Sequence, residues 1–345
     1  MPAADAPLIV RAARREPTPV TPVWLMRQAG RYLPEYRALR ERYGFLELCK
    51  TPAAAAEVTL QPVRRFAVDA AILFADILLL LEPLDVGLEF ARGGGPVIHR
   101  PVRSEADVGR LKPIDVASSV GAVFETVRLV RRELSPAVAL IGFAGAPFTV
   151  ASYVVEGGAS RDFLWTKRLM YEAPGAWHRL LEVLADATAT YLNGQIDAGA
   201  QMVQLFDSWV GVLAPDDYRT YVLPHTRSVI QALRPGTPVI HFGTGTATLL
   251  PLMREAGGDV IGLDWRVDLD RGWAAVGHDV GVQGNLDPAL LLARPAMLRE
   301  RVQAILARAG GRPGHLFNLG HGVHQSTPVD HVRALVDMVH ELSAR

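Results

Sequence analysis

The sequence predicts an α/β protein, a single-domain (β/α)₈ TIM barrel with its active site at the C-terminal rim of the strands. Short apolar runs rich in β-branched and aliphatic residues alternate with longer segments of helical periodicity. About eight such runs fit within 345 residues, which is the length that one barrel needs. No Ser/Gly/Pro-rich linker divides the chain. We therefore expect one domain over residues 1–345, with residues 1–20 as an N-terminal extension.

The alternation can be followed along the chain. The expected strands are residues 22–26, 69–74, 137–143, 201–206, 238–242, 259–263, 279–283 and 315–319. Between them, amphipathic helices are predicted over residues 120–133, 176–196 and 217–233. A doubly wound open sheet is the alternative architecture. Its nucleotide-binding members carry a Gly-x-Gly-x-x-Gly turn after the first strand, and the first predicted strands here are not followed by one.

Composition excludes several classes of function. Lys and Arg number 36 against 36 Asp and Glu, so the net charge is zero, whereas binding to nucleic acid or to an anionic membrane surface calls for a basic excess. The single cysteine, Cys49, excludes an internal disulfide and any site built from several thiolates. The N-terminus lacks the apolar core of a signal peptide, and the most apolar stretch, residues 70–90, is interrupted by charges and a proline. We expect a cytoplasmic protein that does not span a membrane.

A cluster of arginines is the strongest local signal. Residues 22–37 read PVWLMRQAGRYLPEYR, in which a glycine and a proline disfavour a long helix. The arginines of this segment are Arg27, Arg31 and Arg37. Guanidinium groups bind carboxylates and phosphates bidentately, so the segment predicts a site for an acidic ligand. A solvated surface loop is the alternative, but the apolar residues 24–26 look like a buried strand that would bring Arg27 to its end.

Polar residues follow almost every predicted strand. They are Asp76, the residues of GFAGAPFT at 142–149, Asp207, Ser208, His241, Asp264, the turn at 283–285, Asn318, Gly320 and His321. In a barrel, these positions converge on the C-terminal rim, where such enzymes have their active sites. Taken singly, an Asp or Ser after a strand more often caps a helix, and a His beside an apolar run is more often a hydrogen-bonded core residue. Together they predict a ligand site at the rim.

Four long blocks of sequence resemble a known family. They are MRQAGRYLPEYR at 26–37, LQPVRRFAVDAAILFADIL at 60–78, GFAGAPFTVASYVVEGG at 142–158 and FNLGHGVHQSTP at 317–328. In composition, order and separation they are similar to the uroporphyrinogen decarboxylases, and the likeness runs from about Pro22 to near the end of the chain. Only the segment after Asp76, with Leu81, Glu82 and Pro83, departs from the expected pattern.

The resemblance implies a cytoplasmic, homodimeric (β/α)₈ barrel with a tetrapyrrole substrate. The implied reaction removes CO₂ from the four acetate side chains of uroporphyrinogen III to give coproporphyrinogen III, in porphyrin and haem biosynthesis. The resemblance implies no metal and no organic cofactor. The substrate carries eight carboxylates, which agrees with an arginine-rich site on a neutral protein.

The resemblance also assigns roles to individual residues. Loss of CO₂ needs an electron sink, and a pyrrole protonated next to its acetate-bearing carbon supplies one as an iminium cation. Asp76 corresponds to the residue that accepts hydrogen bonds from the pyrrole N–H groups and stabilises this cation. Arg27 and Arg31 correspond to arginines that bind substrate carboxylates and act in catalysis, and the backbone amides of Gln28, Ala29 and Gly30 could assist as an anion-binding turn.

The remaining implied contacts surround the macrocycle. Tyr153, Ser208 and His321 match positions that hydrogen-bond the propionate or acetate groups, and Phe206 is expected to pack on the macrocycle face. Arg37 and Arg40 either join them or pair with Glu35 or Glu41 at the surface.

The sequence leaves two alternative functions open. Zinc-dependent methyltransferases of the same superfamily hold the metal with a His-x-Cys element and a distant Cys, but the corresponding residues here are His241, Phe242 and Gly243, without the thiol. A tetrapyrrole carrier that has lost catalysis is the second alternative. The presence of Asp76 together with Arg27 and Arg31 favours the enzyme.

Overall fold

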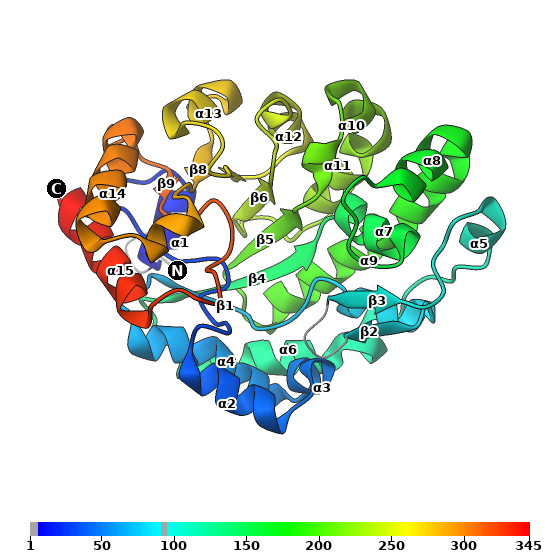
Figure 1. The fold of residues 1–345 in the computed structure, drawn as a ribbon, viewed down its shortest axis with the longest axis horizontal. Coiled ribbons are helices and arrows are strands. Elements are labelled where there is room, and N and C mark those ends of the chain that lie inside the picture. Colours follow the sequence, from blue (N-terminus) through cyan, green and yellow to red (C-terminus); the bar gives the residue numbers. More distant parts are fainter. Residues whose placement is uncertain (1–5, 91–94) are drawn as a thin grey trace.

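A parallel sheet of seven strands forms the centre of the molecule (Figure 1). The computed structural model describes residues 6–90 and 95–345. The strands run in the spatial order β1 (Ala70–Ile72), β4 (Ala139–Gly145), β5 (Met202–Asp207), β6 (Val239–Gly243), β7 (Val260–Gly262), β8 (Gly281–Gln283) and β9 (His315–Leu316). Every neighbouring pair is parallel, and each strand overlaps one of the runs predicted from the sequence. The α/β prediction is therefore confirmed.

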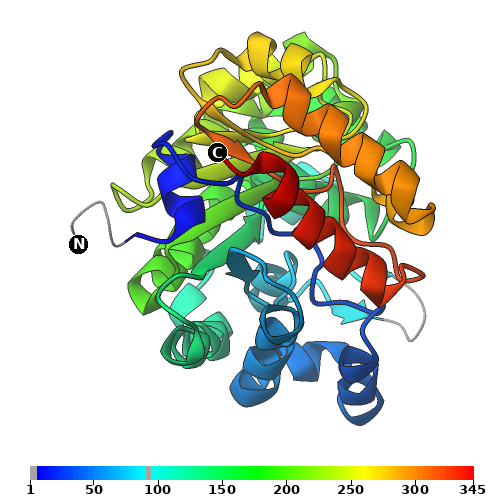
Figure 2. The ribbon, with the colours of Figure 1, turned by 90° about the vertical axis from the view of Figure 1, so that its left-hand side faces the viewer.

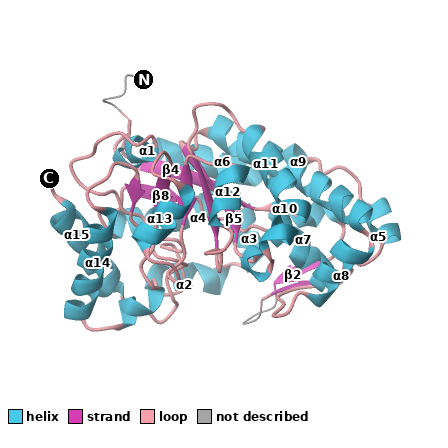
Figure 3. Cartoon of the chain, turned by 90° about the horizontal axis from the view of Figure 1, so that it is seen from above, coloured by secondary structure: helices cyan, strands magenta, loops and turns pink. Residues whose placement is uncertain are grey.

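The sheet curls, and its strands are covered on both faces. The central strand residues Ile141, Val203, Ile240 and Val260 have no exposed surface. Burial on both faces is typical of parallel strands, because crossover helices cover the outer face. Figure 3 shows these strands at the centre, enclosed by helices. The separate β2 (Leu88–Phe90) and β3 (Pro96–Ile98) form an antiparallel pair.

The predicted strand at residues 22–26 is not one of the seven strands of the sheet. Among the described residues it forms a single β-bridge. Val23 pairs in parallel with Phe317, and Phe317 N–H donates to the Pro22 carbonyl at 2.8 Å. On the other side, Asp69 N–H donates to the Val23 carbonyl at 2.9 Å, and Val23 N–H donates to Asp69 Oδ2 at 2.7 Å. The segment thus contacts the chain just before β1 and just after β9, the two outer strands of the sheet.

The helices lie outside the sheet, as Figures 1 and 2 show. They are α1 (Leu8–Ala13), α2 (Pro34–Arg42), α3 (Phe45–Lys50), α4 (Pro52–Arg65), α5 (Glu105–Gly109), α6 (Val116–Glu133), α7 (Pro147–Glu156), α8 (Leu164–Glu172), α9 (Pro174–Ala198), α10 (Pro215–Tyr221), α11 (Leu223–Gln231), α12 (Leu250–Ala256), α13 (Leu269–Val276), α14 (Pro295–Ala309) and α15 (Val329–Ser343). Short 3₁₀ helices are η2 (Leu79–Leu84), η3 (Val210–Val212) and η4 (Pro288–Leu292).

Two of the predicted helices are confirmed and one is divided. Residues 120–133 lie within α6 and residues 176–196 within α9. The predicted helix 217–233 is two helices, because the backbone leaves the helical region at Val222 (φ −125°, ψ −50°). Pro224 follows in the first turn of α11, where its missing N–H costs nothing, whereas within one continuous helix its ring would clash with the preceding turn.

The N-terminal helix α1 packs against the sheet. Within the predicted extension 1–20, of which residues 1–5 lie outside the described part, Ile9 is fully buried. Arg14 and Arg15 donate to the carbonyls of Gly236 and Asp279, residues that precede β6 and β8. Helix α1 therefore lies at the amino ends of the strands and leaves the opposite end of the sheet for the polar residues that follow the strands.

A chain of buried amides fixes the segment before Arg27. Trp24 Nε1 donates to Gln283 Oε1 at 2.9 Å, and Gln283 Nε2 donates to Gln204 Oε1 at 3.0 Å. Gln204 Nε2 in turn lies 3.6 Å from Met26 Sδ. Because buried polar groups are costly to leave unpaired, these contacts hold residues 24–26 in one position. They thereby determine where Arg27 emerges.

Candidate active site

The arginine segment forms a turn that is held from inside by Gln28. The Gln28 side chain is fully buried; its Oε1 accepts from Leu25 N–H at 3.0 Å, and its Nε2 donates to the Ala70 carbonyl at 2.9 Å. The backbone N–H of Gln28 donates to the Leu25 carbonyl at 2.9 Å, so this amide is already occupied. Arg27, which is exposed, has a positive φ of 60°. Gln28 thus supports the turn that presents Arg27.

The rest of this turn leaves groups free to bind an anion. Within residues 6–90 and 95–345, the amides of Ala29 and Gly30 have no protein acceptor. A Cβ at Gly30 would lie 2.9 Å from the Arg27 carbonyl, so the close turn needs glycine. Arg31 is exposed, and its side chain has no hydrogen-bond partner in the described part of the chain.

The other two arginines of the segment have structural contacts. Arg37 Nη1 donates to the carbonyls of Arg31 and Tyr32 at 2.9 and 3.2 Å, which braces the turn. Arg40 Nη1 donates to the Tyr43 carbonyl at 2.7 Å. Glu35, considered as their partner, is instead held by Arg65 through two bonds of 2.7 and 3.1 Å. Of the alternatives for Arg37 and Arg40, pairing with Glu35 is therefore excluded among the described residues.

Asp76 follows β1 and carries a perturbed carboxylate. Its Oδ1 accepts from Leu78 N–H at 2.8 Å, just before η2. Burial raises the pKa of Asp76 to about 6, although the Leu78 amide and the charge of Arg27 both act to lower it. Oδ2 has no protein donor among the described residues. One oxygen therefore caps the turn, and the other remains available to a ligand.

Tyr153 extends the site from α7. Burial raises its pKa to about 12, with a further contribution from the charge of Asp76, so the hydroxyl stays a hydrogen-bond donor at neutral pH. Its ring stacks on Trp209, with centroids 3.9 Å apart and an interplanar angle of 30°. Trp209 N–H donates to Thr149 Oγ1 at 3.2 Å, and the Thr149 hydroxyl donates to Asp207 Oδ1 at 2.8 Å. The position of Tyr153 is thus fixed through Trp209 and Asp207 at the end of β5.

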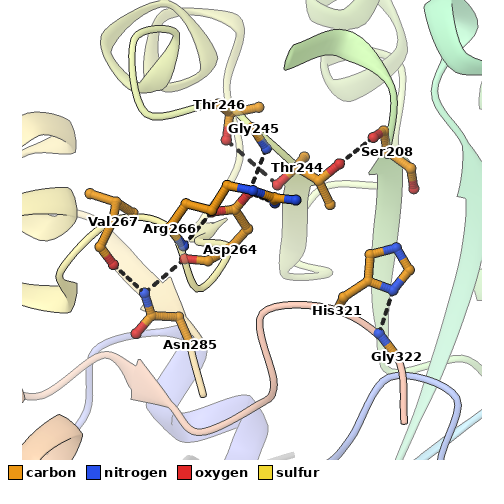
Figure 4. Close-up of polar contacts among 11 residues, drawn as sticks. Ser208, Thr244, Gly245, Thr246, Asp264, Arg266, Val267, Asn285, His321 and Gly322 are labelled. Atoms are coloured by element: carbon orange, nitrogen blue, oxygen red, sulfur yellow. Dashed lines mark hydrogen bonds and ion pairs between the residues drawn. The ribbon is translucent and has the colours of Figure 1, made fainter. Parts of the chain in front are cut away.

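The end of β5 supplies an aromatic wall and a hydroxyl. Phe206 is partly exposed and packs edge-on against Phe143 and Phe242, with centroid distances of 5.6 and 5.9 Å. Ser208 follows, and its carbonyl accepts from the Thr244 hydroxyl (Figure 4). The Ser208 hydroxyl makes no hydrogen bond within the described residues and can therefore donate to a ligand.

His321 lies close to Arg27. Its Nδ1 accepts from Gly322 N–H at 2.7 Å (Figure 4), so in the neutral ring the proton is on Nε2. Burial lowers the pKa of His321 to about 4, and the charges of Arg27 and Arg266 lower it further. A Cβ at Gly322 would lie 2.3 Å from Arg27 Cδ, which shows how closely this loop packs on the arginine. His321 is therefore a neutral N–H donor beside a cation.

Sequence reasoning named Asp264 but missed the two residues after it. Asp264 is buried and accepts from Gly245 N–H, Arg266 N–H and Arg266 Nη1 (Figure 4). The Arg266 guanidinium lies over the Trp265 ring, 3.9 Å from its centroid. The only sequence signal was an aromatic and an arginine directly after a strand-end aspartate.

Some of the residues at the strand ends stabilise the fold and do not line the candidate active site. His241 lies within β6, is fully buried and packs beside the carbonyls of Met253 and Gly257 at the end of α12. Asn318 Oδ1 accepts from Met26 N–H at 3.0 Å and from Leu319 N–H at 2.7 Å. The expectation that all strand-end residues converge on the rim is therefore wrong for His241.

The candidate site combines arginine cations, a carboxylate whose pKa is raised and neutral hydrogen-bond donors, and apolar side chains surround them. The charge of Arg27 acts on the pKa values of Asp76, Tyr153 and His321, and Arg31 lies further along the same turn as Arg27. Among residues 6–90 and 95–345, no group of three or more His, Cys, Asp and Glu side chains could hold a metal ion. In the same residues, no helix is both long and apolar enough to cross a membrane.

Comparison with known proteins decides the family. The family model for uroporphyrinogen decarboxylase (URO-D) matches residues 5–342. The chain belongs to the uroporphyrinogen decarboxylase family. It is 58% identical over 336 residues to the uroporphyrinogen decarboxylase of Carboxydothermus hydrogenoformans, covering 97% of this chain and 96% of that one. The Thermus thermophilus uroporphyrinogen decarboxylase is 55% identical over 338 residues and 98% of each chain. The sequence resemblance is therefore confirmed.

A solved structure agrees on the fold. A methyltransferase from Methanosarcina mazei superimposes with a TM-score of 0.82, covering 96% of this chain and 97% of that one. Its sequence is only 17% identical, so the likeness concerns the fold alone.

Proposed function

We propose that this chain removes CO₂ from the four acetate side chains of uroporphyrinogen III and releases coproporphyrinogen III. Membership of the uroporphyrinogen decarboxylase family over nearly the whole chain carries the proposal. The geometry of the site supports it, since one partly buried carboxylate, Asp76, lies among residues that can bind peripheral carboxylates. The product is a haem precursor, which places the reaction in porphyrin biosynthesis.

In the proposed mechanism, Asp76 stabilises the cationic pyrrole. Protonation of the ring carbon beside the acetate-bearing carbon gives an iminium cation, and CO₂ then leaves while its bonding electron pair enters the ring. Protonation of the resulting methylene carbon and loss of the ring proton give the methyl group. Asp76 Oδ2 has no protein donor in the described residues and would accept hydrogen bonds from the pyrrole N–H groups. The hydrogen bond from Leu78 N–H to Oδ1 holds the carboxylate in place.

The surrounding residues would position the carboxylates. Arg27 and Arg31 are permanently charged and therefore suit binding and orientation better than proton donation, although one of them could lie near the proton transfer. The free amides of Ala29 and Gly30 could add backbone donors, while Gln28 contributes through the fold of the turn. Tyr153, Ser208 and His321 would donate to propionate or acetate groups, and Phe206 would pack on the macrocycle. No metal or organic cofactor is needed, because the pyrrole is the electron sink.

The wider architecture is part of the proposal. Residues 22–26 would close the curled sheet as the eighth strand, because Val23 hydrogen-bonds to Asp69 on one side and pairs in parallel with Phe317 on the other. The chain would then be a single (β/α)₈ domain over residues 1–345, and we expect a cytoplasmic homodimer.

Anaerobic incubation of the purified, metal-stripped protein with uroporphyrinogen III tests the function. Mass analysis should show successive losses of CO₂ that end at coproporphyrinogen III. Tight binding without CO₂ release would instead identify a tetrapyrrole carrier. Activity that returns only on addition of zinc would indicate metal chemistry and contradict the proposal.

A further inference from the structure

Arg266 is the most prominent charged group near the site that the proposed mechanism does not use. It lies in the segment after β7, and its side chain is 52% exposed. Nη1 donates to Asp264 Oδ2 at 2.7 Å, whereas Nε and Nη2 have no protein acceptor in the described residues. The Nε and Nη2 groups of the guanidinium, which do not bond to Asp264, therefore remain free to bind a ligand.

The contacts of Arg266 hold it in one orientation. Asp264 is 2% exposed, and its carboxylate accepts hydrogen bonds from both the guanidinium and the backbone N–H of Arg266. The Arg266 guanidinium also stacks on the Trp265 ring, 3.9 Å from the centroid of the ring. A long exposed arginine normally loses conformational entropy on binding, and a stacked and paired one has already lost most of it.

The loop that carries Arg266 is itself fixed. Asn285 Nδ2 donates to the Asp264 carbonyl at 2.8 Å and to the Val267 carbonyl at 2.6 Å (Figure 4). A Cβ at Gly320 would lie 2.3 Å from Trp265 N, so the loop before His321 packs directly against this backbone. The structure therefore couples the position of Arg266 to the position of His321.

Arg266 faces the site. Figure 4 shows its guanidinium directed toward the side where Ser208 and His321 lie. Trp265 contacts His321 edge-on, with centroids 6.4 Å apart, and the charge of Arg266 contributes to the lowered pKa of His321.

We propose that Arg266 binds a carboxylate on the edge of the macrocycle near Ser208 and His321, with Asp264 and Trp265 as its positioning residues. The proposal rests on the proposed function for its ligand. The free Nε and Nη2 groups form a fork that matches a carboxylate bidentately. A carboxylate bound there would belong to a propionate or an acetate, which share this chemistry.

The test compares Arg266→Gln and Arg266→Lys with the wild type. Arg266→Gln removes the charge, and the KM for uroporphyrinogen III should rise about tenfold or more, equivalent to about 1.4 kcal/mol. Arg266→Lys keeps a cation for Asp264 but loses the fork, so its KM should lie between those of the wild type and Arg266→Gln. Arg271→Gln is the matched control, since Arg271 also lies near an aspartate, Asp268 at 3.7 Å, but is 81% exposed on α13. Its KM should not change.

Binding of coproporphyrinogen III, measured by anaerobic equilibrium dialysis, distinguishes the two sources of the carboxylate. This ligand has only propionates, so weaker binding by Arg266→Gln identifies a propionate, and unchanged binding with a raised KM identifies an acetate. If both quantities match the wild type in folded Arg266→Gln and Arg266→Lys, the inference is overturned. A wild-type protein without turnover would refute the proposed function, while the dialysis would still test Arg266. NMR should also show a higher pKa of His321 in Arg266→Gln, and an unchanged value would contradict the placement.

Discussion

Asp76→Asn separates the charge of the central carboxylate from its shape. Asparagine can keep the Oδ1 bond to Leu78 N–H, which is 2.8 Å long, but it replaces the free oxygen with an amide donor. That donor would face pyrrole N–H groups and could not stabilise the cation. Loss of one pre-organised electrostatic group typically costs a factor of ~10²–10³ in turnover. We expect kcat for uroporphyrinogen to fall by this amount, while KM changes less because the peripheral carboxylates keep their partners.

The same substitution should stabilise the folded chain. The pKa of Asp76 is about 6 instead of its ordinary 3.8, so the folded state disfavours the anion. The destabilisation is absent below about pH 4, grows between about pH 4 and 6, and is complete above pH 6. Each pH unit corresponds to about 1.4 kcal/mol, which gives at most about 3 kcal/mol at pH 8. Thermal unfolding at pH 8 should therefore occur a few °C higher in Asp76→Asn, and the gain should vanish near pH 4.

Asp115→Asn is the control for a simple helix cap. Asp115 caps α6 by accepting from Ser118 N–H at 3.2 Å, and its pKa is lowered, chiefly by the Ser118 side chain. This variant should unfold at a slightly lower temperature at pH 8 and keep full turnover. In the wild type, kcat/KM should fall as pH drops through about 6, because Asp76 becomes protonated. If Asp76→Asn turned over substrate like the wild type, Asp76 would be a helix cap and the central-anion mechanism would be refuted.

Other predictions concern the walls of the site. Arg31→Lys keeps the charge but loses the fork, so KM should rise by the equivalent of ~1.5–3 kcal/mol; an unchanged KM would place Arg31 outside the site. Gly322→Ala should raise KM and lower the temperature of thermal unfolding, because its Cβ would lie 2.3 Å from Arg27 Cδ and 3.0 Å from Arg27 Cβ, so Arg27 must shift; a KM equal to the wild type would show that Arg27 does not bind substrate where it stands. Chelator treatment should leave turnover intact, as should Cys49→Ser, since Cys49 is a buried thiol whose pKa burial raises; loss of turnover in a folded sample of either would contradict this mechanism. His321 should stay neutral down to about pH 4, so NMR titration of its ring should show no protonation near pH 6.

Local sequence signals predicted most of the fold. The strands are apolar runs with nearly every residue buried, so composition alone marks them. The segment 22–26 was harder to assign, because its pairing depends on Asp69 and Phe317, which are distant in sequence. The break at Val222 had a local signal in Pro224, which the helical periodicity of residues 217–233 concealed.

Long motifs indicated candidate site residues, whereas contacts that only the tertiary structure creates could not be predicted from the sequence. Sequence alone could not show that the Gln28 side chain turns inward to Ala70 and Leu25, since an amide in a loop has no periodicity that indicates its direction. Arg266 was missed for a similar reason. Its importance comes from the approach of the loop at Gly320, which is over fifty residues away along the chain.

The charge balance of the site has a consequence for product release under the proposed reaction. Each step consumes one proton and releases neutral CO₂, so the ligand loses one negative charge every time an acetate becomes a methyl group. The cations Arg27, Arg31 and Arg266 keep their charge throughout, because a guanidinium does not titrate near neutral pH. In the proposed complex, their attraction for the ligand would therefore weaken stepwise, while Asp76 would still face the same four pyrrole N–H groups. With the proposed roles of these residues, a site on a chain of zero net charge would bind the eightfold acidic substrate more firmly than the fourfold acidic product.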